Sequence, residues 1–149
     1  MMAAPSLHTP LSTEISIRPL SIYPWGPPDS ISCNFHEADL EADDSSEADP
    51  LFTALSYTWG SEHDSRKISV NGHSVTIRRN LYDFLVYAKR EGWVYNLWID
   101  ALCINQSDTH EKNKQVALMG HIYSRAYRVL IWLGELGDPE SQGLLDFQK

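Results

Sequence analysis

The sequence predicts an α/β domain: a parallel-sheet core with crossover helices, joined by antiparallel N-terminal strands and a β-hairpin. Three apolar runs, at 52–57, 97–104 and 129–133, have the length of buried strands. Helical patterns at about 81–91 and 109–126 separate these runs. Strands that alternate with helices through short connections favour parallel pairing, in which each helix crosses from one strand to the next.

The composition is that of one globular domain. Of the 149 residues, 42% are hydrophobic and 21% are charged, and no apolar run approaches the roughly 18–20 residues of a membrane helix. The N-terminus lacks the basic and apolar segments of a secretory signal. Cys33 and Cys103 form neither a disulfide framework nor a zinc set. We therefore expect a cytoplasmic protein with no membrane segment and no metal site.

The net charge of −8 is confined to the first third of the chain. Residues 1–50 hold nine acids against one base, Arg18, whereas residues 51–149 hold eleven of each sign. Because the chain has no basic stripe, we do not expect it to bind nucleic acid. The acidic cluster at 37–49 is typical of a solvated loop.

The chain divides into three parts. Residues 1–13, with two prolines and small polar side chains, predict a flexible tail. Residues 14–50 hold N-terminal strands and the acidic loop, and residues 51–149 hold the core domain. Residues 138–140, Asp-Pro-Glu, predict the start of a further helix. Because the chain stops at Lys149, inside that predicted helix, we interpret the core domain as C-terminally truncated.

The N-terminal part predicts two strands. Apolar and polar side chains alternate over residues 14–23. Pro19 interrupts this run and suits an edge strand, because proline cannot donate a hydrogen bond to a ladder. We interpret residues 31–40 as the second strand.

The clearest local signal in the sequence is a hairpin turn. Asn71 and Gly72 lie between two strand patterns, at 67–70 and 73–77. This dipeptide supplies the two positive-φ residues that a type I′ turn needs. The sequence therefore predicts an antiparallel hairpin here.

Two helices are predicted in the core domain. Asn80 is placed to cap the first helix, and Gly92 is placed to end it. In the second helix, at about 109–126, a stripe that includes Val116 and Met119 is expected to face the core.

Three blocks of sequence in the core domain carry a family resemblance. Residues 54–60 are Ala-Leu-Ser-Tyr-Thr-Trp-Gly, residues 80–82 are Asn-Leu-Tyr, and residues 97–106 are Leu-Trp-Ile-Asp-Ala-Leu-Cys-Ile-Asn-Gln. The third block continues as a spaced pattern over 111–134. In order and spacing, these blocks resemble the heterokaryon incompatibility (HET) domain of fungal self/non-self recognition proteins, over roughly residues 52–134.

The resemblance implies a module of fungal non-self recognition that promotes programmed cell death. HET domains are regarded as similar to TIR domains, which are flavodoxin-like α/β modules that signal by self-association. The implied partners are therefore further copies of the chain and other incompatibility proteins. Some TIR domains hydrolyse NAD, so two functions remain open. One is an NAD hydrolase, for which NAD is the substrate and no cofactor is required; the other is a non-enzymatic module that acts by homotypic self-association.

Glu111 is the candidate catalytic residue, because TIR domains that hydrolyse NAD place a glutamate near the start of the helix after a central strand. Ligands of open α/β sheets bind beyond the carboxyl ends of the strands, and Glu111 follows the 97–104 run. A carboxylate there would stabilise positive charge on the ribose as nicotinamide leaves. Helix capping is the alternative, because Asp108 and Glu111 have the spacing of a capping box.

The candidate ligand-binding residues belong to the matching blocks or share the helix face of Glu111: Ser56, Trp59, Asp100, Asn105 and Gln115. Asp100 lies in an apolar run, where a carboxylate must be paired, with Arg78, Arg79 or a backbone amide as structural partners. Trp59 is placed either to stack on a ligand ring or to pack in the core, as we expect for Trp98 and Trp132.

Overall fold

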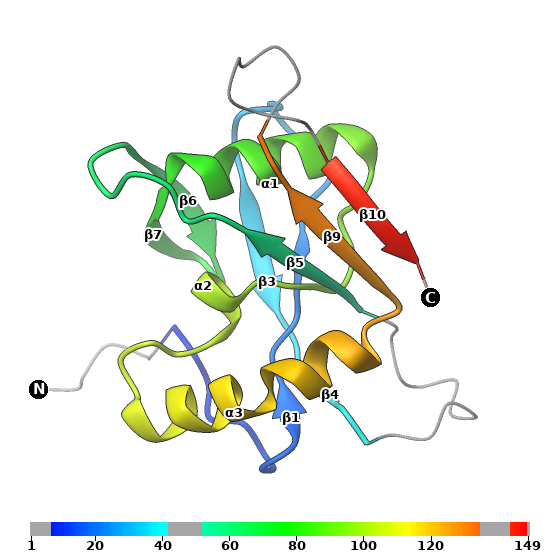
Figure 1. Ribbon diagram of the computed structural model, residues 1–149. Coiled ribbons are helices and arrows are strands. Elements are labelled where there is room, and N and C mark those ends of the chain that lie inside the picture. The colour runs from blue at the N-terminus through cyan, green and yellow to red at the C-terminus, as the bar shows by residue number, and fades with distance from the viewer. Residues whose placement is uncertain (1–6, 42–51, 135–143, 149) are drawn as a thin grey trace, which may run out of the picture.

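The computed structural model describes residues 7–41, 52–134 and 144–148 (Figure 1). Its main feature is a mixed eight-stranded sheet in the order β10-β9-β5-β8-β2-β3-β6-β7, beside a separate β1–β4 pair. The strands are β1 Ser16–Ile17, β2 Leu20–Ile22, β3 Ser32–Phe35, β4 Ala38–Asp39, β5 Thr53–Tyr57, β6 Ser65–Val70, β7 His73–Arg78, β8 Leu97–Trp98, β9 Arg128–Trp132 and β10 Leu144–Gln148. The helices are α1 Arg79–Glu91, α2 Asp100–Cys103 and α3 Thr109–Arg125.

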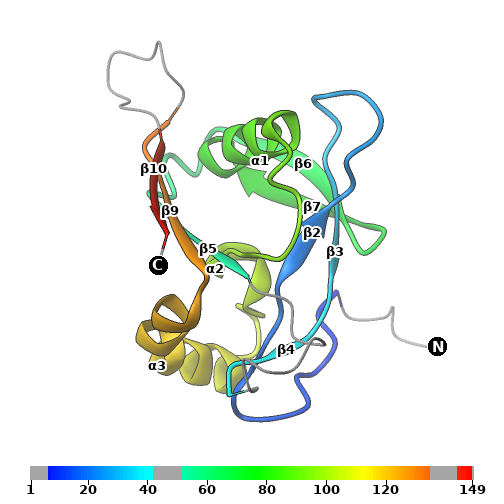
Figure 2. The same ribbon diagram turned by 90° about the vertical axis from the view of Figure 1, so that its right-hand side faces the viewer.

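The parallel part of the sheet is smaller than the sequence predicted. β5 pairs in parallel with β8 on one side and β9 on the other, and α1 and α3 lie in the connections that cross between these strands. β3 and β6 form a second parallel pair, but the remaining pairs in the sheet are antiparallel. The α/β class is confirmed, and the sheet is mixed. Figure 2 shows α1 toward the top of the molecule and α3 toward its bottom.

The prediction of an edge strand over 14–23 is wrong. Pro19 divides the run: β1 before it pairs with β4, whereas β2 after it lies inside the main sheet between β8 and β3. Leu20 and Ile22 are buried there. Pro19 has no N–H to donate, and its carbonyl accepts the His36 N–H at 3.0 Å. The proline therefore marks a break between two sheets.

The predicted hairpin is confirmed. β6 and β7 pair antiparallel, with Val70 opposite His73 next to the turn. Asn71 has φ 50° and Gly72 has φ 79°, which are the two left-handed positions of a type I′ turn. Figure 1 shows this hairpin at the left margin of the sheet.

Asn80 does not cap α1, contrary to the prediction. The N-cap is Arg78, which has no side-chain capping bond. The Asn80 amide instead donates to the Thr58 carbonyl at 2.5 Å and accepts the Trp132 indole N–H at 3.1 Å. This side chain therefore connects the end of β5 to β9. Gly92 ends the helix in the left-handed conformation, as predicted.

The run 97–104 is not one strand. β8 has only two residues, and the chain then turns into α2, where the Cys103 N–H donates to the Ile99 carbonyl at 2.7 Å. Ile99, Leu102 and Ile104 are buried. A continuous apolar run is equally compatible with a strand covered on both faces and with a short buried helix, so periodicity did not separate the two.

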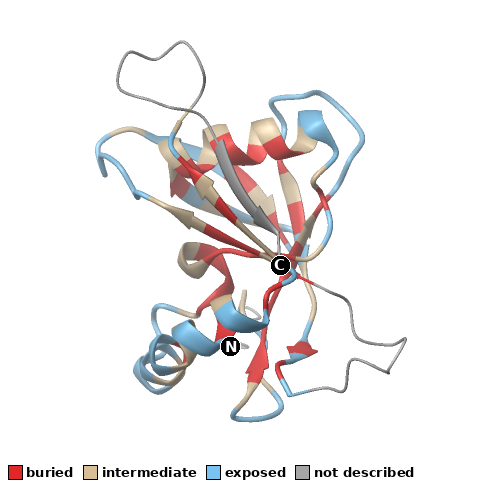
Figure 3. Cartoon of the chain, turned by 45° about the vertical axis from the view of Figure 1, so that its right-hand side comes forward, coloured by how far each residue is buried: buried red, intermediate tan, exposed pale blue. Residues whose placement is uncertain are grey.

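The second predicted helix is confirmed, and most of its predicted stripe packs on the core. Ala126 is buried and Met119 and Tyr123 are half-buried against the core, but Val116 is 53% exposed, so its place in the stripe is wrong. Gln115 and Ile122 are the buried residues of α3. Figure 3 shows α3 largely exposed and the buried residues concentrated in the sheet and on α1. Trp98 and Trp132 lie in the core, as predicted.

The prediction of a C-terminal helix is wrong for residues 144–148. The expected helix start at 138–140 lies outside the described residues, and 144–148 form β10, which pairs antiparallel with β9. Parts of the predicted tail (1–6) and acidic loop (42–51) also lie outside the described residues. Among the described helices, none has both the length and the apolar character needed to cross a membrane.

Candidate functional site

The start of α3 brings together two predicted site residues, Asn105 and Glu111, and the predicted cap Asp108. Asp108 is the N-cap, and its Oδ1 accepts the Glu111 N–H at 3.2 Å. The Glu111 carboxylate does not return the bond to the cap, as a reciprocal capping box would require. Its Oε2 accepts the Asn105 N–H at 2.5 Å, which fixes the loop that precedes the helix.

Arg18 holds the Glu111 carboxylate from the other side. Its Nη2 lies 2.7 Å from Oε1 and its Nη1 lies 3.1 Å from Oε2, so the pair is bidentate. The same guanidinium donates to the Cys103 carbonyl at 2.9 Å and the Thr9 carbonyl at 2.6 Å. Arg18 therefore connects the break between β1 and β2 with α2, α3 and the N-terminal segment.

This ion pair is shielded from water. The side chains of Arg18 and Glu111 are 3% and 12% exposed. Burial alone would raise the pKa of the Glu111 carboxyl, but the hydrogen bonds from Arg18 and the Asn105 N–H outweigh burial and hold the pKa below its usual value. Glu111 is thus an ionised acceptor whose two oxygens are both occupied.

Gln115 lies one turn further along α3 and is 2% exposed. Its Nε2 donates to the Ser16 carbonyl at 3.0 Å, which attaches α3 to β1. Its Oε1 has no hydrogen-bond partner among the described residues. The predicted shared face of Glu111 and Gln115 is confirmed, and both side chains on it contact the N-terminal strands.

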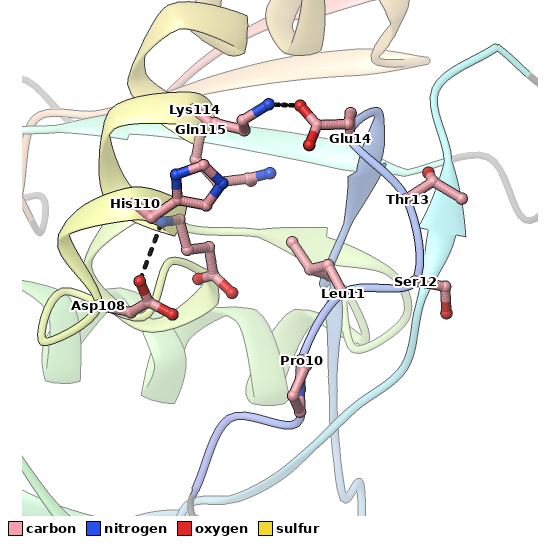
Figure 4. A pocket seen from close by; sticks show the side chains of 10 residues that line it. Pro10, Leu11, Ser12, Thr13, Glu14, Asp108, His110, Lys114 and Gln115 are labelled. Carbon is pink, nitrogen blue, oxygen red and sulfur yellow. Dashed lines mark hydrogen bonds and ion pairs between the residues drawn. The ribbon is translucent and has the colours of Figure 1, made fainter.

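A cavity of about 290 Å³ borders this cluster. Figure 4 shows the start of α3 on one side of the cavity and residues 10–14 on the other. Lys114 and Glu14 form an ion pair across it. Glu111 and Gln115 both reach its wall, beside His110.

A second cluster lies beyond the carboxyl ends of β5 and β8. Trp59 follows β5 and is 39% exposed, so the expectation that it packs in the core is wrong. The Arg78 guanidinium carbon lies 5.2 Å from the centre of the Trp59 ring, and Arg78 Nη1 donates to the Gly60 carbonyl at 3.0 Å. This cation–π contact covers one face of the indole.

Asp100 contributes to the same cluster. Its Oδ1 accepts the Ala101 N–H at 2.8 Å, so a backbone amide is its partner, one of the three structural partners that the sequence suggested. Burial raises the pKa of the Asp100 carboxyl, although the bonds from Ala101 and the Trp59 indole lower it. Beside this cluster, a cavity of about 180 Å³ is lined by β7, α2 and the residues Tyr57, Trp59 and Gln106.

The structure separates the predicted site residues into these two clusters. Glu111, Asn105 and Gln115 belong to the first, and Trp59 and Asp100 to the second. Ser56 lines neither cavity; it is half-buried within β5. Within the described ranges, no three His, Cys, Asp or Glu side chains gather as metal ligands.

Sequence reasoning missed Arg18, the residue that organises the first cluster. A signal was present: it is the only base among the first 50 residues, and it lies between buried residues of two strands. A lone base in an apolar run requires a buried acid or several carbonyls as partners. The pattern did not identify Glu111 as that acid, because the two are 93 residues apart.

Comparisons with known proteins converge on one family. The family model described as heterokaryon incompatibility protein (HET) matches residues 52–149. A Neurospora crassa protein named heterokaryon incompatibility protein 6, OR allele, is 31% identical over a 156-residue alignment that covers 95% of this chain. The alignment covers 21% of the Neurospora protein, so the chain spans about a fifth of the length of this relative. No solved structure matches the chain.

Proposed function

The chain belongs to the heterokaryon incompatibility (HET) family, and from this premise we propose that it is a cytoplasmic signalling domain of fungal non-self recognition. In this proposal the domain promotes programmed cell death by associating with further copies of itself and with other incompatibility proteins, and it does so without catalysis. The name of the Neurospora relative supports the role in incompatibility. The choice of mechanism rests on the site.

The Arg18–Glu111 ion pair is the observation that favours a non-enzymatic mechanism. A carboxylate that stabilises a developing cation must direct its charge at the reacting carbon. Here both Glu111 oxygens face the Arg18 guanidinium and the Asn105 N–H. The charge of Glu111 is therefore already neutralised by a fixed partner, and the pair connects four segments of the fold.

TIR-like NAD hydrolysis is the second candidate function. It is favoured by the cavity of about 290 Å³ that Glu111 borders. Under this alternative, the cavity would admit the nicotinamide end of NAD, and Glu111 would exchange Arg18 for the ribose cation. The two candidate functions predict different outcomes for a double variant in which both Glu111 and Arg18 are replaced by uncharged residues.

The test uses the variants Glu111→Gln, Arg18→Met and the double variant. Each single change leaves one buried partner unmatched, and such changes cost roughly 3–5 kcal/mol when the pair is fully buried. The double change removes both charges, so we expect it to recover much of that loss. Stability, NAD loss followed by chromatography, and cell death on expression in a fungal host are measured for all four proteins.

The non-enzymatic proposal predicts that wild type consumes no NAD, and that cell death is reduced in each single variant and returns with stability in the double variant. NAD hydrolysis predicts turnover by wild type that is absent from every variant lacking Glu111, including a stable double variant. Nicotinamide release with this pattern would overturn the proposal and identify Glu111 as catalytic.

A further inference from the structure

β7 is the edge strand at one end of the main sheet. It ends the main sheet, and among the described residues no strand pairs with its outer side. Figure 1 shows β7 at the margin of the molecule, away from β9 and β10. Unpaired edges are templates for another strand.

The register shows which backbone groups of β7 point outward. In a two-residue type I′ hairpin the residues that flank the turn, Val70 and His73, exchange hydrogen bonds, and bonded pairs then alternate along the ladder. The N–H and C=O groups of Ser74 and Thr76 and the N–H of Arg78 therefore face away from β6, whereas the Arg78 carbonyl belongs to the N-cap of α1. They form a regular row of donors and acceptors at the free edge.

The usual protection of an edge strand is limited on β7 to its last residue, Arg78. Natural edges carry prolines, bulges or charges that prevent pairing. Residues 73–77 contain no proline, aspartate, glutamate, lysine or arginine, and the ladder to β6 has no bulge. The exposed side chains Ser74 and Thr76 are small and polar. Thr, Val and Ile are strong strand formers, so β7 is already in the conformation that a partner strand needs.

We propose that β7 pairs antiparallel with β7 of a second copy, joining the two sheets through their free edges. This inference rests on the proposed self-association and specifies its surface. A two-fold axis at Thr76 places Thr76 opposite Thr76 of the second copy and Ser74 opposite Arg78. The two Thr76 residues then exchange backbone hydrogen bonds and the Arg78 N–H meets the Ser74 carbonyl, which a register centred on Val75 does not achieve for Arg78.

The charged side chains are compatible with this register, because it brings no like charges together. The only charged side chain within the paired strands, Arg78, lies opposite a serine. Lys67 is the cross-strand neighbour of Thr76 within the hairpin. The two copies of Lys67 would be separated by three strand spacings, roughly 14 Å, which exceeds the Debye length of about 8 Å at physiological salt. No like charges are opposed at close range.

The cavity of about 180 Å³ adds an apolar contact. It lies along β7, and its wall includes Val75, Ile77, Leu81 and Leu102. Val75 is only half-buried in one copy. In the Thr76-centred register, Val75 of the second copy lies opposite Ile77 and is directed toward this cavity. A six-residue strand pair makes a small interface, so the association is weak and concentration-dependent.

Opposite charges at position 76 test both the surface and the register. Thr76→Glu and Thr76→Lys each oppose like charges across the two-fold axis, so each variant alone should associate at least about tenfold more weakly than wild type. An equimolar mixture of the two should recover association to within a few-fold of wild type. The Glu variant also gains Lys67 as a cross-strand partner, which protects its fold.

The controls are Ser65→Glu and Ser65→Lys, which add the same charges on β6 at an exposed position away from the free edge. Sedimentation equilibrium measures association, and thermal unfolding confirms folding. Wild type that associates while the Thr76→Glu variant associates equally well would overturn the edge pairing and leave self-association standing. Wild type that stays monomeric at the highest concentration would overturn both.

Discussion

At the scale of single residues, the Arg18–Glu111 pair explains why acids at the start of α3 have different roles. Asp108 caps the helix at its exposed end, whereas Glu111 turns inward to Arg18. Removing one member of a buried ion pair is costly because the remaining charge keeps its desolvation penalty without its partner. Glu111 is thus required by the fold whether or not it also meets a ligand.

The pKa of Glu111 predicts how stability depends on pH. Its folded pKa is lower than its unfolded pKa, so its contribution is present above the unfolded value, about 4.3, and is lost as the pH falls through the folded pKa. The Glu111→Gln variant resembles the protonated side chain at every pH. We therefore expect wild type to exceed this variant in free energy of unfolding at pH 7, and the difference to shrink steadily below about pH 4.

Urea unfolding of both proteins at pH 7, 5, 4 and 3 measures this difference directly. Comparing the two proteins at each pH removes the effect of other carboxyls, which titrate in both proteins. Glu37 is one of these, because the hydrogen bond from the Ser12 N–H lowers its pKa. A difference that stays constant from pH 7 to pH 3 would contradict the assignment of Glu111 as the titrating partner of Arg18.

At the scale of secondary-structure elements, the β6–β7 hairpin depends on backbone geometry at its turn. Gly72 has φ 79°, and a Cβ added there would meet nothing within 4 Å. Gly72→Ala therefore adds no clash, and its cost is the left-handed conformation alone, roughly 1 kcal/mol. Gly120, within α3, has equally open surroundings and no positive φ. Gly120→Ala should stabilise the protein by about 0.5–1 kcal/mol.

The opposite signs of these two glycine substitutions make the test specific. Chemical denaturation of the two variants beside wild type is expected to lower the midpoint for Gly72→Ala and to raise it for Gly120→Ala. Equal changes of the same sign would show that space around the glycine, and not its φ, decides the effect.

The elements that sequence patterns predicted are those whose cause is local. Asn71 and Gly72 define a turn by their own backbone preferences, and Gly92 ends α1 for the same reason. Asn80 was misassigned because its side chain bonds to Thr58 and Trp132, which are distant in sequence, instead of to the helix beginning beside it. A capping preference is weak, worth about 1 kcal/mol, and two tertiary hydrogen bonds exceed it.

The candidate site, like the fold, was predictable only where its contacts are local in sequence. Asp108 as a cap and Glu111 beside a cavity follow from spacing near the start of a helix. The partner of Glu111 does not, because Arg18 reaches it only after β1 packs on α3. Likewise the run 97–104 predicted burial, which Leu102 and Ile104 confirm, but a continuous apolar run does not separate a strand from the short helix α2.

At the scale of the whole molecule, the N-terminal strands are part of the core and not an appendage. The family model begins at residue 52, yet β2 lies between β8 and β3 and is the only described strand that joins the β8-β5-β9 half of the sheet to the β3-β6-β7 half. Ile17, Leu20 and Ile22 are at most 2% exposed. Arg18, from the same segment, neutralises Glu111 in the matched region.

A chain that begins at residue 52 should therefore fail to fold, although it contains the whole matched region. Without β2 the two halves of the sheet lose the strand that joins them, and the buried Glu111 carboxylate loses its cation, Arg18. A chain that begins at residue 7 keeps every described contact and should unfold cooperatively on heating, as we also expect of the full chain. Circular dichroism and thermal unfolding of the three chains measure this, and adding residues 7–41 as a separate peptide should restore a cooperative transition to the shortest. A sharp transition from residues 52–149 alone would mean that the matched region is an independent domain, and that β2 is added to a sheet that closes without it.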